Sequence, residues 1–229
     1  MSRGGAVCSQ TLGGLLGAPQ GSACGSCHAC RYACRDEGRP AHPPAARRLS
    51  LCCVYQAFVK SRAMHIREAK GADLAGILAI YNHAVLHTTA VWSEAPATLE
   101  DRHIWLAAKQ QRRFPVLVAV AGEEVLGFAS YGDFRPWPGY AHSVEHSVYV
   151  APACHRRGVG KALVQALIDH AHNAGYHTMI AGIDASNAPS IALHGALGFT
   201  ETGRLPEVGR KFGRWLDLAF MQKMLNGTR

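Results

Sequence analysis

Residues 144–163 run from a strand through a basic glycine turn into a helix, an order typical of phosphate-binding sites. Apolar and polar residues alternate from 144 to 150, which predicts a β-strand. Pro152 ends the alternation, and apolar residues at three- and four-residue spacing predict a helix over 161–174. The positive end of a helix and its unpaired backbone amides attract anions, and glycine lets the backbone approach them closely. We therefore expect residues 156–161 to bind phosphate.

Glu145 is the candidate for acid–base chemistry beside this turn. Amino groups are mostly protonated at neutral pH, so an amine must lose a proton before it can attack a carbonyl carbon. A carboxylate near the end of a central strand can accept that proton, directly or through a water. The alternation also fits a glutamate that is merely exposed on the strand. The pattern alone leaves both interpretations open.

The glycine spacing in the turn excludes two common phosphate loops. A Walker A loop needs G-x-x-x-x-G-K-S/T, whereas Gly158 and Gly160 are two apart and Ala162 stands where Ser or Thr is required. A Rossmann fingerprint needs a third glycine where Leu163 stands. The turn is similar to the Q/R-x-x-G-x-G/A pyrophosphate loop of the GCN5-related N-acetyltransferases (GNAT), with His155 in place of the usual Gln or Arg.

Further motifs extend the resemblance to this family across nearly all of residues 64–229. They narrow it to phosphinothricin and methionine sulfoximine/sulfone N-acetyltransferases. In chain order they are Ile80-Tyr81-Asn82, the strand 144–150, Asn187 to His194 (NAPSIALH), Leu197-Gly198-Phe199, and Gly209 to Asp217 (GRKFGRWLD). The resemblance implies an acetyl-CoA-dependent enzyme that acetylates the amino group of a small amino-acid-like substrate by direct attack, without a covalent enzyme intermediate. It also implies a homodimer.

The resemblance also assigns roles to residues that match the family's motifs. Glu145 would be the general base, and the backbone at the end of its strand would pair with the pantetheine arm and polarise the thioester carbonyl. His194 stands where many relatives have a tyrosine that protonates the leaving thiolate, although a packed histidine fits nearly as well. Asn187 also suits a helix N-cap. The implied coenzyme-binding residues are Val148, Tyr149, Val150, Arg156, Arg157, Gly158, Val159, Gly160, Lys161, Asn187 and Ser190.

The loop 134–140 (FRPWPGY) precedes the strand with Glu145 and contains two prolines, so regular structure is not expected there. Such a loop can supply an aromatic wall and one cation for a carboxylate or for a phosphinate or sulfoximine oxygen of the substrate. Loop aromatics that only cover the core are the alternative interpretation. The predicted substrate-binding residues are Arg135, Pro138, Gly139 and Tyr140, with Trp92 lining the same pocket.

The order of predicted elements over residues 64–229 is that of an α/β (α+β) domain. Strands are expected at 65–68, 116–121, 125–130, 144–150, 177–183, 199–205 and 215–224. Helices are expected at 73–84, 99–110, 161–174 and 187–197. Together with the resemblance, this order predicts the GNAT fold, a mixed and mostly antiparallel central sheet with helices on both faces.

Residues 1–63 differ in composition from the rest, because they are rich in Gly, Ala, Pro, Ser, Arg and Cys. We expect a disordered extension, or a start assigned too early, with the acetyltransferase domain beginning at Met64. Four cysteines have the spacing of iron–sulfur ligands: Cys24, Cys27, Cys30 and Cys34. The proline that usually follows the fourth ligand is missing, and His28 and His42 could complete a zinc site instead. This metal-binding appendage is the less favoured alternative, and no metal is expected in the enzyme.

Charge, apolar runs and cysteine content argue against a nucleic-acid-binding, membrane-spanning or disulfide-bonded domain. The net charge is +8, but residues 1–63 hold 8 Lys/Arg against 2 Asp/Glu while 64–229 hold 16 against 14, so a nucleic-acid-binding surface is not expected. No apolar run approaches the roughly 18 residues of a membrane helix. Seven of eight cysteines precede Met64, which suits a domain in the reducing cytoplasm. The remaining one, Cys154, lies in a turn without an assured base and is not expected to carry an acyl group.

Two other functions remain open from the residues. The acceptor of such an enzyme can be another amine, such as an ordinary L-amino acid or an antibiotic. A binding module that senses acyl-CoA without turnover is the alternative from another class. Glu145 speaks against that module, because binding alone needs no carboxylate at this position.

Overall fold

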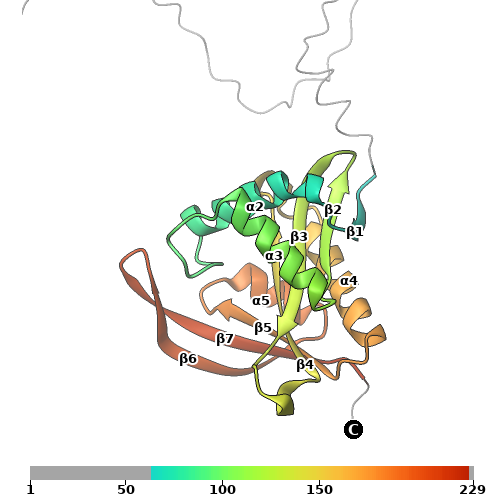
Figure 1. The fold of residues 1–229 in the computed structure, drawn as a ribbon. Coiled ribbons are helices and arrows are strands. Elements are labelled where there is room, and N and C mark those ends of the chain that lie inside the picture. The colour runs from blue at the N-terminus through green and yellow to red at the C-terminus, as the bar shows by residue number, and fades with distance from the viewer. Residues whose placement is uncertain (1–62, 227–229) are drawn as a thin grey trace, which may run out of the picture. The chain divides into compact units, whose positions relative to one another are not determined.

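The structure, a computed structural model, describes residues 63–226, which form a seven-stranded sheet with helices on both faces (Figure 1). The strands are β1 (His65–Glu68), β2 (Val116–Ala121), β3 (Glu124–Asp133), β4 (Ser143–Val150), β5 (Thr178–Asp184), β6 (Thr200–Lys211) and β7 (Arg214–Met224). The helices are α2 (Leu74–His87), α3 (Leu99–Gln111), α4 (Val159–Asn173) and α5 (Ala188–Gly195), with short 3-10 turns η1 (Gly71–Asp73), η2 (Pro138–Tyr140) and η3 (Pro152–Cys154). The predicted fold class is confirmed.

The strand order across the sheet is β1-β2-β3-β4-β5-β7-β6, and β4 pairs with β5 in parallel while the other neighbours are antiparallel. α4 connects β4 to β5, as a parallel pair requires a crossover. Their pairing covers only Ser143–His146 of β4 and Thr178–Ala181 of β5. Beyond these residues both strands continue without pairing to each other, so the sheet parts at its middle.

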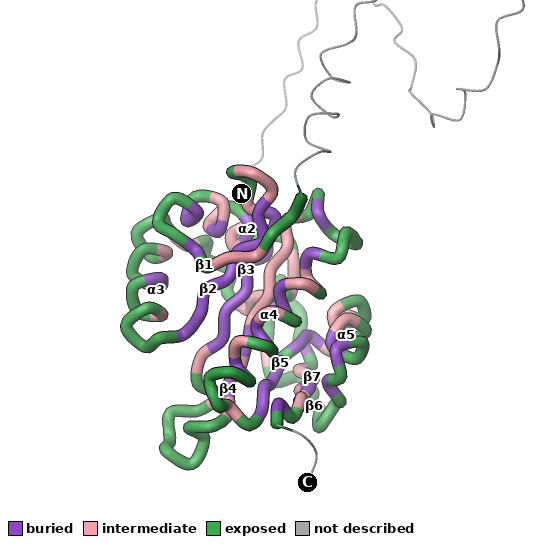
Figure 2. Tube along the Cα trace, turned by 90° about the vertical axis from the view of Figure 1, so that its right-hand side faces the viewer, coloured by how far each residue is buried: buried purple, intermediate pink, exposed green. Residues whose placement is uncertain are grey.

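Side chains of the inner strands are buried on both faces of the sheet. On β2, Leu117 and Ala119 belong to the cluster that includes α4, whereas Val116, Val118 and Val120 belong to the cluster that includes α2 and α3. This alternation is the two-residue period of a strand. Figure 2 shows the buried strands in purple between the exposed outer sides of the helices. The two clusters hold the central strands in place from both sides.

The main departure from the predicted elements is β6, which continues past Pro206 to Lys211 instead of ending at 205. Proline lacks an N–H and is tolerated at an edge strand or a bulge. β6 is one of the two edge strands, and its register against β7 shifts between Leu205 and Gly209. β6 and β7 therefore form a long hairpin that closes at Gly213, whose φ of 74° suits glycine. The other strands and helices differ from the prediction only at their ends. The three 3-10 turns were not predicted, and η2 lies in the loop 134–140, where no regular structure was expected.

Lys211 at the end of β6 ties this hairpin to the loop that follows α2. Its side chain is fully buried, and Nζ donates to the carbonyl oxygens of Val85 at 2.6 Å and Thr88 at 2.7 Å, and also to that of Val91. The last carbonyls of a helix have no donor within the helix. A buried ammonium in turn needs several acceptors. Lys211 and the end of α2 thus satisfy each other's hydrogen bonds.

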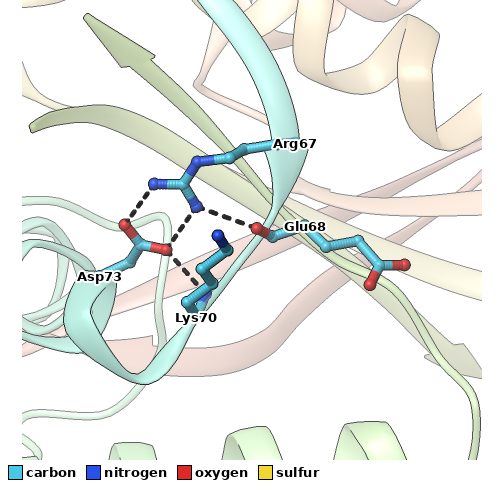
Figure 3. Close-up of polar contacts among 4 residues, drawn as sticks. All are labelled: Arg67, Glu68, Lys70 and Asp73. Atoms are coloured by element: carbon cyan, nitrogen blue, oxygen red, sulfur yellow. Dashed lines mark hydrogen bonds and ion pairs between the residues drawn. The ribbon is translucent and has the colours of Figure 1, made fainter. Parts of the chain in front are cut away.

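An ion pair fixes β1 to the start of α2 (Figure 3). Arg67 donates through two nitrogens to the carboxylate of Asp73 at 2.7 and 2.8 Å, and the backbone amide of Lys70 donates to the same carboxylate at 2.7 Å. Asp73 is 5% exposed. The hydrogen bonds from Arg67 hold the pKa of Asp73 below its ordinary value, although burial acts in the opposite direction.

Replacing Lys211 by methionine is expected to lower the free energy of unfolding by roughly 2–4 kcal/mol, because buried carbonyls lose their donor. Arg210→Met removes a positive charge from the exposed neighbouring position and is the matched control, with an expected change of about 0.5 kcal/mol or less. Urea unfolding of both variants measures the difference. Wild-type stability of Lys211→Met would mean that the loop satisfies its carbonyls in another way.

Replacing Asp73 by asparagine is expected to lower the free energy of unfolding at neutral pH by about 1–3 kcal/mol. Because the folded pKa of Asp73 is lowered, its contribution is present above the unfolded pKa and is lost as pH falls through the folded pKa. The deficit of the variant should therefore shrink in acid, as measured by urea unfolding across pH.

The control for this prediction is Glu201→Gln, which removes the partner of Arg204 from an exposed ion pair. Exposed pairs of this kind contribute little to stability, because water and salt screen their charges. A deficit of Asp73→Asn that equals the control, or that stays constant from neutral to acid pH, would contradict the assignment.

Candidate active site

A cavity of about 230 Å³ lies where β4 and β5 part. Its wall consists of residues 145–149 of β4, residues 181–184 of β5, part of α5 with its N-cap, and Ala90 from the loop after α2. The structure therefore brings together six residues that were predicted for the site from separate motifs. They are Glu145, Val148, Tyr149, Asn187, Ser190 and His194.

The cavity wall holds buried polar atoms without a hydrogen-bond partner. Within residues 63–226, five buried side-chain nitrogen or oxygen atoms lack one. Four of them belong to the wall: both ring nitrogens of His146, Nε2 of His194 and Oδ2 of Asp184. Leaving a buried polar group unpaired costs free energy, so such groups normally meet a partner. Their concentration in one cavity indicates a site built for a polar ligand.

Glu145 is half-buried in this wall, and its carboxylate lies over Gly182 of β5. A Cβ built on Gly182 would be 3.0 Å from Glu145 Oε1, so the glycine leaves room for the carboxylate. Burial raises the pKa of Glu145, while the positive charge of Arg135 acts in the opposite direction. A carboxylate with a raised pKa is a better match for accepting a proton near neutral pH.

The turn before α4 presents backbone amides and positive charge at one helix end. Gly158 is the N-cap of α4 and has a φ of 81°, a left-handed conformation that suits glycine. The amide of Ala162 donates to the Gly158 carbonyl at 3.0 Å, and the amides before Ala162 precede this first helical bond. Arg156, Arg157 and Lys161 are exposed. These are the features of an anion-binding helix end.

Gly160 and His155 bring this turn into contact with α5 and with the end of β4. A Cβ on Gly160 would lie 3.2 Å from Leu193 Cδ1 and 3.5 Å from Val150 Cγ2, so the start of α4 packs closely on α5 and β4. Nε2 of His155 lies 3.1 Å from the carbonyl oxygen of Val150 and donates to it. The histidine that departs from the family's pattern therefore anchors the turn to the end of β4. Val150 and residues 156–161 lie outside the cavity wall.

His194 is buried and bonded through one ring nitrogen. Its Nδ1 lies 2.7 Å from the carbonyl oxygen of Ser190, which can only accept, so Nδ1 carries the proton and Nε2 is left as an acceptor. Burial lowers the pKa of His194, which keeps the ring neutral near pH 7. A neutral ring without a proton on Nε2 cannot protonate a thiolate. This arrangement does not favour the general-acid role that was predicted for His194.

The predicted substrate-binding residues lie outside the cavity wall. Arg135 is exposed with its guanidinium 4.2 Å from the centroid of the Phe134 ring, and its charge still acts on Glu145. η2 contains Pro138, Gly139 and Tyr140 and is exposed. The Tyr140 ring packs edge-on against Phe134, with centroids 5.7 Å apart. The loop is thus an aromatic surface beside Glu145.

Trp92 packs on β6, which corrects the expectation that it lines the pocket. A Cβ on Gly209 would lie 2.1 Å from atoms of the Trp92 ring, so only glycine fits beneath it. Nε1 of Trp92 donates to the Thr89 carbonyl at 2.9 Å. Together with Lys211, these contacts hold the loop after α2, and Ala90 is the residue of this loop that reaches the cavity.

Sequence reasoning missed the second wall of the cavity, which consists of residues 181–184 and Ala90. The strand at 177–183 was predicted, but its position beside β4 was not. A signal was present, because a helix that connects two strands of one sheet is typical of a parallel pair. Ala90 had no such signal, since small loop residues have no distinctive pattern.

The metal-binding alternative concerns Cys24, Cys27, Cys30 and Cys34, which lie outside the described residues. Between residues 63 and 226, no three His, Cys, Asp or Glu side chains are grouped so that they could hold a metal ion. Across the same residues, no helix is both long and apolar enough to cross a membrane. Cys154 is 2% exposed and belongs to the core cluster under α4.

Known proteins are similar to this chain in sequence and in fold. Residues 66–220 match the family model of the Acetyltransferase (GNAT) domain. The chain is 54% identical to L-methionine sulfoximine/L-methionine sulfone acetyltransferase of Pseudomonas paraeruginosa, over 72% of this chain and 96% of the relative. It is 48% identical to L-amino acid N-acyltransferase MnaT of Escherichia coli, over 71% of this chain and 95% of the relative.

A solved structure of yncA from Salmonella typhimurium, described as a putative acetyltransferase with its cofactor acetyl-CoA, has a TM-score of 0.71 and 51% identity to this chain. The match covers 72% of this chain and 96% of that one. These relatives confirm the predicted fold, the use of acetyl-CoA and the N-acetyltransferase activity. The chain belongs to the acetyltransferase (GNAT) family.

Proposed function

We propose that this enzyme acetylates the amino group of methionine sulfoximine, methionine sulfone or phosphinothricin, with Glu145 as the general base. The observation that carries the mechanism is the position of Glu145, a half-buried carboxylate with a raised pKa in the wall of the cavity between β4 and β5. The substrate class rests on the sulfoximine/sulfone acetyltransferase at 54% identity. The L-amino acid N-acyltransferase at 48% identity favours ordinary amino acids as the second candidate.

In the proposed reaction, Glu145 accepts a proton from the substrate ammonium group, directly or through a water. The free amine then attacks the thioester carbonyl carbon, a C–N bond forms and the C–S bond breaks with its electron pair on sulfur. Residues 148–150 lie on the part of β4 that has no partner in β5. Because the amide of Ala151 bonds to β3 and amides alternate along a strand, those of Val148 and Val150 face the gap, and one of them is proposed to polarise the carbonyl. The new C–N nitrogen then loses a second proton to solvent, coenzyme A leaves as the thiolate, and Glu145 returns the first proton to solvent before the next turnover.

The coenzyme is proposed to lie between the parted strands with its pyrophosphate on residues 156–161. The exposed cations of that turn and the free amides of α4 support this position. Asn187 and Ser190 line the cavity on the α5 side, where the pantetheine arm would pass. The Asn187 side chain already accepts from the amide of Ser190 at 3.1 Å, so its N-cap role leaves its amide nitrogen for the coenzyme.

Arg135 is proposed to bind the carboxylate or the sulfoximine, sulfone or phosphinate oxygen of the substrate. Its charge acts on Glu145, so an anion held by Arg135 would place the substrate's amino group near the base. Pro138, Gly139 and Tyr140 would form the adjoining surface through η2. Trp92 would act on substrate binding only through the loop that carries Ala90.

We further infer that residues 64–229 are the catalytic domain of a cytoplasmic homodimer and that residues 1–63 are an extension. The family match begins at residue 66, and relatives align over about 72% of this chain. The hairpin of β6 and β7 exposes apolar side chains that a second copy would cover. They are Leu205, Val208, Phe212 and Trp215.

Replacing Glu145 by glutamine is expected to lower kcat by about 10²–10⁴-fold, because the amide cannot accept the proton. The dissociation constant for acetyl-CoA should stay unchanged. Coenzyme A release with methionine sulfoximine, methionine sulfone, phosphinothricin and plain amino acids measures activity, and calorimetry measures binding. In the wild type, kcat should rise with pH as Glu145 loses its proton above its raised pKa.

Each result of this panel has a defined meaning. Turnover with plain amino acids alone would keep the reaction and replace the substrate class. Full activity of Glu145→Gln would overturn the role of Glu145. Binding of acetyl-CoA without turnover of any amine would favour an acyl-CoA sensor.

Replacing Gly182 by alanine is expected to lower kcat by about tenfold or more, because the added methyl group stands 3.0 Å from Glu145 Oε1 and displaces the carboxylate. Gly203→Ala is the matched control, since a Cβ there meets no atom within 4 Å. Steady-state kinetics and thermal unfolding separate loss of activity from loss of fold. Unchanged kcat in a folded Gly182→Ala would show that the carboxylate has no fixed position there.

A further inference from the structure

Two buried imidazoles lie next to each other on the α5 side of the cavity. The rings of His146 and His194 have centroids 5.1 Å apart and planes inclined by 30°, and Phe199 packs against both. Both histidines line the cavity. His146 is 7% exposed and His194 is 2% exposed. Three of their four ring nitrogens have no partner.

The fourth ring nitrogen, Nδ1 of His194, determines which of the other ring nitrogens can donate a hydrogen bond and which can accept one. His194 Nδ1 donates to the Ser190 carbonyl, so its Nε2 can only accept. Burial lowers the pKa of His146 to about 3, and the neighbouring His194 acts in the same direction. His146 is therefore neutral and offers one N–H donor and one acceptor. Neither ring can release a proton to a leaving group without becoming an anion.

A water molecule can bond to both rings, because it can accept one hydrogen bond and donate two, and buried waters typically have about three polar partners. It can accept from the N–H of His146 and donate one hydrogen to Nε2 of His194. Its second hydrogen then remains for a third group in the cavity. The fixed tautomer of His194 makes this water a donor toward that group.

The position of the pair along β4 identifies the third group. Residue 146 follows Glu145, and the two side chains point to opposite faces of the strand. In the proposed reaction, the acyl carbon attacked by an amine at Glu145 lies just beyond this level, where β4 and β5 part after His146 and Ala181. The sulfur is bonded to that carbon and takes the electron pair when the C–S bond breaks. The α5 side of the cavity is therefore where that charge needs a donor.

We propose that His146 and His194 are positioning residues that hold one water molecule as a hydrogen-bond donor to the coenzyme A sulfur. The inference rests on the proposed function, since it requires the coenzyme between β4 and β5. When the C–S bond breaks, the electron pair stays on sulfur and is stabilised by this hydrogen bond. The first proton that the substrate ammonium loses goes to Glu145 and the second goes to solvent, so no proton has to leave either imidazole.

The test compares coenzyme A with desulfo-coenzyme A, which lacks the sulfur, on the full chain. Calorimetry should give a wild-type preference for coenzyme A of about tenfold, the value of a hydrogen bond to a charged group. The ultraviolet absorbance of the bound thiolate should show ionisation at lower pH than in free coenzyme A. His146→Phe, which keeps a ring and removes both nitrogens, should abolish the preference and return the ionisation to that of the free thiol.

Phe199→Leu is the control, because it alters the packing of both rings without removing a nitrogen. It should keep the preference for coenzyme A. His194→Phe gives a second route if His146→Phe does not fold, and it should also abolish the preference. Equal wild-type affinity for the two ligands, or a preference kept in either histidine variant, would overturn this inference alone. Failure of both ligands to bind the wild type would overturn the proposed function as well.

Discussion

The short pairing of β4 with β5 is the constraint on which the site depends. A parallel pair inside a sheet normally continues, because every backbone N–H and C=O needs a partner. Here it stops at His146 and Ala181, and the backbone edges beyond these residues face a cavity. α4 and α5 lie over this part of the sheet, and each presents its N-terminal end there. The binding site follows from an interruption in the sheet rather than from a surface loop.

Other parts of the molecule keep this interruption in shape. Gly182 leaves space for the Glu145 carboxylate, and Gly160 allows the start of α4 to approach β4 and α5. Lys211 holds the end of α2 and the loop that brings Ala90 to the cavity. These residues do no chemistry themselves. Lys211 gives the motif at 209–217 a structural role, although this motif lies far from Glu145 in the sequence.

The sequence predicts the local part of this arrangement well. Alternation in β4, the glycine turn and the apolar stripe of α4 are short-range patterns, so this strand, turn and helix were predicted from the residues, whereas the role of Glu145 was implied by the resemblance. Contacts across the sheet were not predictable in this way. The carbonyls that hold Lys211 lie over a hundred residues earlier in the chain, and Trp92 meets a glycine of β6. The extension of β6 past Pro206 depends on its place at the sheet edge, which no local pattern contains.

Glu145 and His146 are neighbours on one strand, and yet both line the same cavity. Successive side chains of a strand point to opposite sides of its sheet, so the cavity where β4 and β5 part is lined from both faces of the sheet. The amine proposed to meet Glu145 and the coenzyme proposed to lie beside α4 and α5 would then approach from opposite faces. The architecture thus suits a kinetic scheme in which both substrates are held together in one ternary complex before they react.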